Sequence, residues 1–71
     1  MRITGKVTYV KLSGGFWGIE GDDGQKYHPV DGLPKAYQKE GQRVSAKVSP
    51  VQAFGIFMWG QDVNVEKIDQ L

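Results

Sequence analysis

Turn-forming residues divide this 71-residue chain into pieces too short for long helices. Glycine occurs ten times, which is about twice its usual share of roughly 7%. Together with serine, aspartate and proline, it marks turns at residues 13–15, 22–24, 31–32, 41, 50–55 and 60. The segments between these turns have the length of β-strands, so the sequence favours a fold built mainly of short strands.

Alternation of apolar and polar residues identifies the clearest strand, residues 43–49. Val44, Ala46 and Val48 share one face of this segment, and polar side chains occupy the other face. A strand with this pattern buries one side in a core and leaves the other side in water. We therefore expect these three side chains to lie in the core.

The N-terminal segment, residues 2–12, also has strand character, but its apolar face changes side. Ile3 and Val7 alternate with polar residues, whereas Val10 falls on the polar parity. A β-bulge or a bend in a strand produces such a change. The sequence therefore predicts an irregularity near Tyr9.

The segments 16–21 and 25–29 form the clearest predicted hairpin. They flank Asp22-Asp23-Gly24, in which the glycine adopts a positive φ without strain. Adjacent aspartates before a glycine are common turn chemistry. We therefore interpret the two carboxylates as turn residues and not as a pair for metal binding or acid–base catalysis.

Side chains of the first hairpin strand divide between two faces. Glu20 shares parity with Phe16 and Gly18. A charged side chain belongs on the solvent side of a half-buried strand. Trp17 and Ile19 are therefore expected in the core, and Phe16 is expected on the outer face.

One segment, residues 33–41, differs from the strands. Pro34 suits the first position of a helix and Gly41 suits a C-cap, so one or two helical turns are expected. The order of three strands, a short helix and two strands over a single domain, residues 1–71, matches the oligonucleotide/oligosaccharide-binding (OB) barrel. We predict an all-β, five-stranded OB-like barrel with its helix between strands 3 and 4. An SH3-like barrel, whose short turn lies between the last two strands, is the alternative.

The C-terminal part contains a segment, Ile56–Trp59, that is apolar on both parities. Val63 and Val65 resume the alternation after Gly60, which is typical of a last strand kinked at a glycine. In a barrel, one side of such a strand fills the core. The other side is then expected to be covered by the domain's own helix near Tyr37, by neighbouring long side chains or by another protein.

Composition narrows the classes of function. Nine Lys and Arg against eight Asp and Glu leave a net charge of +1 and a pI near 8.0, short of the pI above about 9 that marks an electrostatically driven nucleic-acid binder. The absence of cysteine excludes disulfides, thiolate zinc sites and cysteine nucleophiles. A catalytic or metal site would have to be assembled from carboxylates and hydroxyls around His28, the only histidine. We predict a binding module without catalytic residues, metal or cofactor.

The most apolar stretch, residues 53–60, is far shorter than the roughly 20 residues needed to cross a bilayer. No basic-then-apolar leader follows Met1. The sequence therefore predicts a cytoplasmic protein without a membrane partner.

Several short motifs resemble the cold-shock domain family. Gly5–Val10, Gly15–Ile19 and Asp22–Gly24 follow the spacing of that family's G-x-V-K-W-F strand, G-F-G-F-I strand and D-D-G turn. Glu40–Val44 is similar to its E-G-Q-x-V segment. The resemblance covers well under half of the chain, and a separate group of small OB-like proteins is the alternative. It implies an OB barrel that binds single-stranded RNA or DNA by stacking bases on exposed aromatic side chains.

Only half of the aromatic platform implied by this resemblance is present. Phe16 keeps the family's phenylalanine, but Tyr9 stands in place of a tryptophan. Val10 and Gly18 each stand in place of a phenylalanine. Because stacking contributes about 1–3 kcal/mol per base, the loss of two rings predicts weak binding.

These considerations define a candidate nucleic-acid site on the strands. Its residues are Lys6, Tyr9, Phe16, Lys26 and His28. Aromatic rings stack on bases, and lysines neutralise phosphates. The competing interpretation places Tyr9 in the core and treats the lysines as ordinary surface positions.

The predicted function is therefore a non-catalytic module that binds single-stranded RNA or DNA weakly and with tolerance of sequence. The alternative is a protein-interaction or self-associating module that uses the strand Ile56–Trp59, with Phe57 and Trp59 as contact residues.

Overall fold

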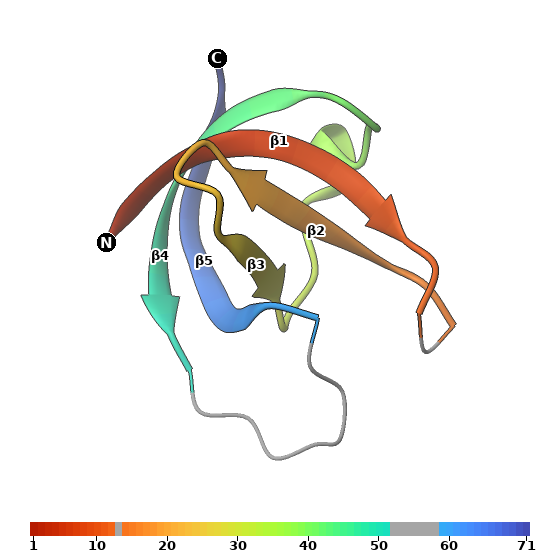
Figure 1. Cartoon of the computed structure of the whole chain (residues 1–71). Helices are drawn as coiled ribbons and strands as arrows, with labels where there is room; N and C mark the ends of the chain where they lie inside the picture. Colours follow the sequence, from red (N-terminus) through yellow and green to blue (C-terminus); the bar gives the residue numbers. More distant parts are fainter. Residues whose placement is uncertain (13, 52–58) are drawn as a thin grey trace.

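The computed structural model describes residues 1–12, 14–51 and 59–71 and has an all-β fold. Five strands close into a barrel in the order β1-β2-β3-β5-β4, with β4 returning to β1 (Figure 1). The strands are β1 (Arg2–Val10), β2 (Phe16–Gly21), β3 (Lys26–Pro29), β4 (Arg43–Pro50) and β5 (Gln61–Gln70). This architecture confirms the predicted OB-like five-stranded barrel.

The barrel has one parallel seam. β1 pairs with β2 and β4, β2 pairs with β3, and β4 pairs with β5, all in antiparallel fashion. β3 and β5 run parallel and close the barrel through three residue pairs, which are Tyr27 with Gln61, His28 with Asp62 and Pro29 with Val63. Strand β5 then continues along β4 alone, since β3 ends at Pro29.

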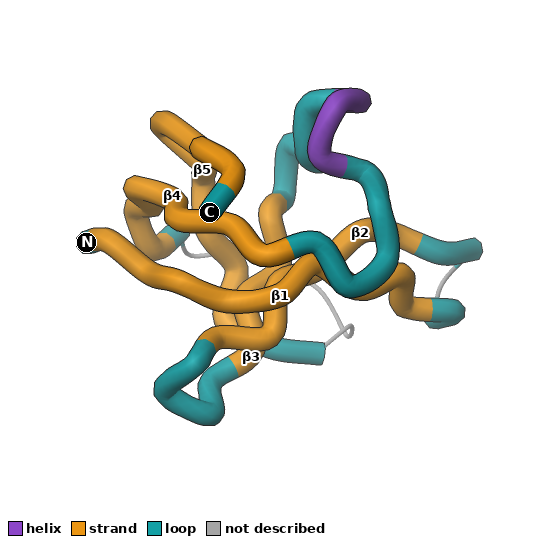
Figure 2. The backbone as a smooth tube through the Cα atoms, turned by 90° about the horizontal axis from the view of Figure 1, so that it is seen from above, coloured by secondary structure: helices purple, strands orange, loops and turns teal. Residues whose placement is uncertain are grey.

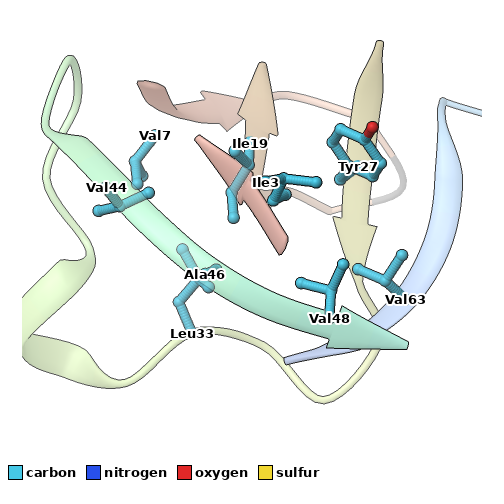
Figure 3. Packing of buried hydrophobic residues seen from close by; sticks show 9 residues of the cluster. All are labelled: Ile3, Val7, Ile19, Tyr27, Leu33, Val44, Ala46, Val48 and Val63. Carbon is cyan, nitrogen blue, oxygen red and sulfur yellow. The ribbon is translucent and has the colours of Figure 1, made fainter. Parts of the chain in front are cut away.

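The barrel interior is filled by buried side chains from all five strands and from the loop after β3 (Figure 3). The described members of this core are Ile3, Val7, Ile19, Tyr27, Leu33, Val44, Ala46, Val48 and Val63. Val44, Ala46 and Val48 are completely buried, as the alternation in β4 predicts, and so is Ile19. Full burial of a side chain such as valine or isoleucine contributes about 1.5–3 kcal/mol.

Trp17 does not occupy the core position expected of it. Its side chain is half-buried and packs against the edge of the core. Its register partner is Tyr9, and the two rings meet edge to face with their centroids 5.1 Å apart. Strand parity correctly predicts the face of the sheet on which Trp17 lies. It does not show that the Tyr9–Trp17 pair lies near the end of the β1–β2 pairing, where side chains on that face reach solvent.

The predicted change of face in β1 is confirmed, because Val7 and Val10 are buried while Tyr9 is exposed. A β-bulge is not its cause, because the β1–β2 register runs without interruption. Instead, β1 changes its other neighbour: it pairs with β4 only as far as Lys6, and the backbone of Val7 then bonds to residues 41 and 42.

The helical segment is shorter than predicted. It is a single 3₁₀ turn, η1 (Lys35–Tyr37), between β3 and β4 (purple in Figure 2). Pro34 precedes the turn with an extended ψ of 144°, and Gly41 lies beyond it in the turn that leads into β4. The position of η1 fits the OB-like order. Within the described ranges, no helix is long and apolar enough to span a membrane.

The turn between β2 and β3 forms as predicted, with Gly24 at a φ of 85°. Asp22 fastens this turn to β4, because Arg43 donates two hydrogen bonds to its carboxylate, at 2.6 and 2.7 Å. Thr4 Oγ1 donates a third, at 2.9 Å. The Arg43 guanidinium, followed by the Thr4 hydroxyl, holds the pKa of Asp22 below its ordinary value.

Candidate functional site

The outer face of β2 and β3 brings together aromatic and charged side chains. Phe16 and Glu20 lie on the outer parity of β2, and Lys26 and His28 lie on the outer parity of β3. Cross-strand register places Glu20 opposite Lys26. Phe16, Lys26 and His28, three of the five predicted site residues, therefore share one surface.

Among the described residues, the rings of Phe16, His28 and Trp59 cluster on this surface, and we call these three the ring cluster. The centroids of Phe16 and His28 are 4.3 Å apart. Trp59, in the bend just before β5, meets Phe16 edge to face at 5.4 Å. The Lys26 ammonium lies over the Trp59 ring, 5.5 Å from its centroid, which is a cation–π distance.

Gly18 makes room for Trp59 within the ring cluster. A Cβ on Gly18 would lie 2.6 Å from ring atoms Cη2 and Cζ3 of Trp59, closer than real Cβ atoms approach a neighbour. The tryptophan therefore supplies an aromatic group at the strand position where the cold-shock motif carries a phenylalanine. Sequence reasoning missed this contribution, although a glycine on the outer face of a strand is a signal that another group approaches closely.

His28 is held in place by a carboxylate from the neighbouring strand. Its Nδ1 lies 2.9 Å from Oδ1 of Asp62, its register partner across the parallel β3–β5 seam. About one fifth of each side chain is exposed, at 19% for His28 and 21% for Asp62. An imidazole whose Nδ1–H donates to a carboxylate keeps a fixed ring orientation, so Asp62 fixes the tilt of His28 against Phe16.

A surface hollow of about 270 Å³ adjoins the ring cluster. It is lined by Thr8, Tyr9, Val10, Lys11, Glu20, Lys26 and Trp59. One wall is therefore aromatic, and the polar groups of the lining side chains include two ammonium groups, one carboxylate and two hydroxyls. Such a mixture suits a ligand that has a flat apolar body and both negative charge and hydrogen-bonding groups at its edges.

Two predicted site residues lie apart from the ring cluster. Tyr9 is 41% exposed, which rules out the core alternative for it, but its ring contacts Trp17, and its hydroxyl lies where a Cβ of Gly15 would be. Tyr9 contributes to the site only as one of the residues that line the hollow. Lys6 lies further along β1, opposite Glu20, and does not line the hollow.

The two predicted partner-binding residues have different outcomes. Phe57, like the rest of residues 52–58, lies outside the described residues. Trp59 is described and lies in a bend, so the prediction that it belongs to a strand was wrong. Phe16 and Gly18 of β2 cover one side of the Trp59 ring. The helix near Tyr37 was expected to provide such a cover within the domain.

No model of a known protein family matches this chain, and no curated protein or solved structure is significantly similar to it. The geometry of the ring cluster and its hollow therefore carries the functional argument.

Proposed function

We propose that this protein is a non-catalytic module that binds single-stranded nucleic acid weakly and with tolerance of sequence. The observation that carries the proposal is the ring cluster on the outer face of the barrel. It places Phe16, His28 and Trp59 together beside the ammonium group of Lys26. Aromatic groups beside a cation are the combination that stacks bases and neutralises the adjoining phosphates.

The rings supply the affinity that is independent of sequence. Every base has a π-face, so a base stacks on an aromatic side chain whatever its hydrogen-bonding groups are, for about 1–3 kcal/mol. A duplex hides these faces inside its own stack. The ring cluster therefore favours single strands over double strands.

The charges supply a modest electrostatic contribution. Lys26 and Lys11 border the hollow, and Glu20 lies between the positions of Lys26 and Lys6 on neighbouring strands. This carboxylate opposes the field of the lysines, and the whole chain carries a net charge of only +1. Few phosphates are neutralised, so the proposed binding is weak and its salt dependence is shallow.

An NMR titration with mixed-sequence DNA heptamers tests this proposal directly. The amide resonances of β2, of β3 and of residues 59–61 should shift, and the same strands annealed to their complements should shift them less. Binding should weaken as salt is raised. If no oligonucleotide binds more tightly than the roughly 10⁻⁴ M of non-specific contact, even at low salt, the proposal is wrong.

The protein-interaction alternative makes a different prediction. A Trp59→Ala variant should lose self-association while it keeps its fold, as measured by sedimentation over a range of concentrations. A chain that stays monomeric at the highest concentration contradicts self-association through this residue.

A further inference from the structure

Glu20 places a negative charge on the proposed nucleic-acid interface, and the attraction of phosphates by lysines does not explain why it is there. Its carboxylate lines the same hollow as Trp59 and Lys26, on the surface where a nucleic acid is proposed to bind. A negative charge at this place repels phosphates. Among the residues that the structure describes, the carboxylate of Glu20 makes neither an ion pair nor a hydrogen bond, so its two oxygens are available to a ligand.

An ionised carboxylate only accepts hydrogen bonds, and this property limits the bases that suit it. Guanine carries two adjacent donors, N1–H and the N2 amino group, which fit both oxygens at once. Adenine and cytosine each offer one amino group beside a ring acceptor, and thymine or uracil offers one N–H between two carbonyl groups. Guanine is therefore the base that engages both oxygens without bringing an acceptor against them.

Lys26 extends the match to the third group on the same edge of guanine. The O6 acceptor adjoins N1–H, and an ammonium group is a donor without acceptor capacity. Cross-strand register places Lys26 directly opposite Glu20. Lys26 and Glu20 thus offer one ammonium donor beside two carboxylate acceptors, next to the aromatic wall of Trp59.

We propose that Glu20, with Lys26 and Trp59, selects a guanine base within the bound single strand. This inference rests on the proposed nucleic-acid function and adds a preference at one position. The base lies against the Trp59 ring in the hollow, its N1–H and N2 amino group donate to Glu20, and Lys26 donates to O6. The remaining positions of the strand keep their tolerance of sequence.

The test compares DNA heptamers that differ only in the central base of a thymine strand. T3-G-T3 should bind about tenfold more tightly than T3-A-T3 or T7. This ratio lies in the lower part of the range by which a bidentate contact discriminates against a wrong base. A central hypoxanthine, which lacks the N2 amino group, should lose most of that advantage. Intrinsic tryptophan fluorescence at low salt measures each affinity.

Substitution of the carboxylate then identifies its role. Glu20→Gln should bind the guanine and adenine strands equally, and it should bind T7 at least as well as the native chain does, because a charge that repels phosphates has been removed. Glu66→Gln changes the net charge identically, on β5 and outside the hollow, and should leave the tenfold ratio unchanged. Circular dichroism shows whether both variants keep the fold.

The outcomes separate this inference from the function on which it rests. If the native chain binds all heptamers equally, guanine selection is wrong and single-strand binding stands. If no heptamer binds, both fail. If GMP binds as tightly as T3-G-T3, and Glu20→Gln abolishes both, guanine recognition stands and the single-strand function is overturned.

Discussion

Trp59 lies so close to Gly18 that ring atoms Cη2 and Cζ3 would be 2.6 Å from any Cβ at that position. A glycine on β2 and a tryptophan in the bend before the last strand therefore form one structural unit. The glycine sets how closely the indole approaches the sheet, and the indole completes the ring cluster with Phe16.

Replacement of Gly18 by alanine should displace Trp59 and weaken binding of single strands severalfold. The new methyl group cannot fit against the ring, so the indole moves away from Phe16 and becomes more exposed. In a Trp17→Phe background, the emission of Trp59 should shift to longer wavelength. Gly24→Ala is the control, because it strains a turn at a φ of 85° but touches nothing near Trp59. That variant should lose stability and keep its emission wavelength.

Phe16→Ala should reduce the affinity for single strands by about 1–3 kcal/mol, because it removes one stacking surface. The loss should be similar at low and high salt, since the ring carries no charge. Isothermal titration at two salt concentrations measures it. An unchanged affinity in a folded variant would assign Phe16 to the scaffold alone.

With T7, which has no guanine for Lys26 to contact, Lys26→Ala should weaken binding most at low salt and flatten the dependence of affinity on salt, because one phosphate contact is lost. Lys47 gives a matched control. It is exposed on β4, which lies two strands away from both β2 and β3 in the barrel. If Lys47→Ala flattens the salt dependence as much as Lys26→Ala does, attraction is spread over the whole surface and the assigned interface is wrong.

Val48→Asp should unfold the domain. Val48 is completely buried, and an unpaired carboxylate in an apolar core costs several kcal/mol against a total stability of about 5–15 kcal/mol. Circular dichroism should show the loss of β-structure. Lys47→Asp places the same group one residue earlier, on the outer face, and should stay folded. A folded Val48→Asp variant would contradict the register of β4.

The domain should lose stability in acid as Asp22 and Asp23 are protonated. Arg43 chiefly lowers the pKa of Asp22, and the backbone N–H of Gln25, followed by the hydroxyl of Tyr27, lowers that of Asp23. Because both folded-state pKa values lie below the unfolded value of about 3.9, the stabilisation is complete well above that pH. It disappears as the pH falls through the folded-state values.

Urea unfolding of native and Asp22→Asn protein at several pH values checks this effect. The variant should be less stable at neutral pH. The difference should shrink as the pH falls through the folded-state pKa of Asp22, because the native carboxyl group then also becomes uncharged. A difference that stays constant over this range would show that the Arg43–Asp22 pair does not act through charge.

Features fixed by near neighbours in the chain could be predicted from the sequence. Alternation in β4 gave the burial of Val44 and Val48 correctly, because a strand with a two-residue period has one inner face. Gly24 marked its turn correctly because a positive φ is a local requirement. The closed OB-like barrel followed from the order of such elements.

The site could be predicted only in part, because its geometry depends on contacts between distant parts of the chain. His28 was recognised as a candidate, but its partner Asp62 lies 34 residues away and is reached only through the parallel seam. Glu40, within the cold-shock-like motif, accepts a hydrogen bond from the Tyr9 backbone at 2.8 Å. Its visible role is to fasten the loop before β4 to β1, which a motif comparison does not reveal.

Nucleic acid bound to the ring cluster, as proposed, would span the parallel seam of three residue pairs between β3 and β5. Phe16 and His28 belong to the β2–β3 hairpin, whereas Trp59 leads into β5, so the ring cluster straddles the line where the barrel closes. A ligand in contact with all three rings would hold the two sides of that line together. Its binding energy should then oppose the opening of the barrel, so the amide hydrogens of His28 and Asp62 should exchange more slowly with solvent in its presence.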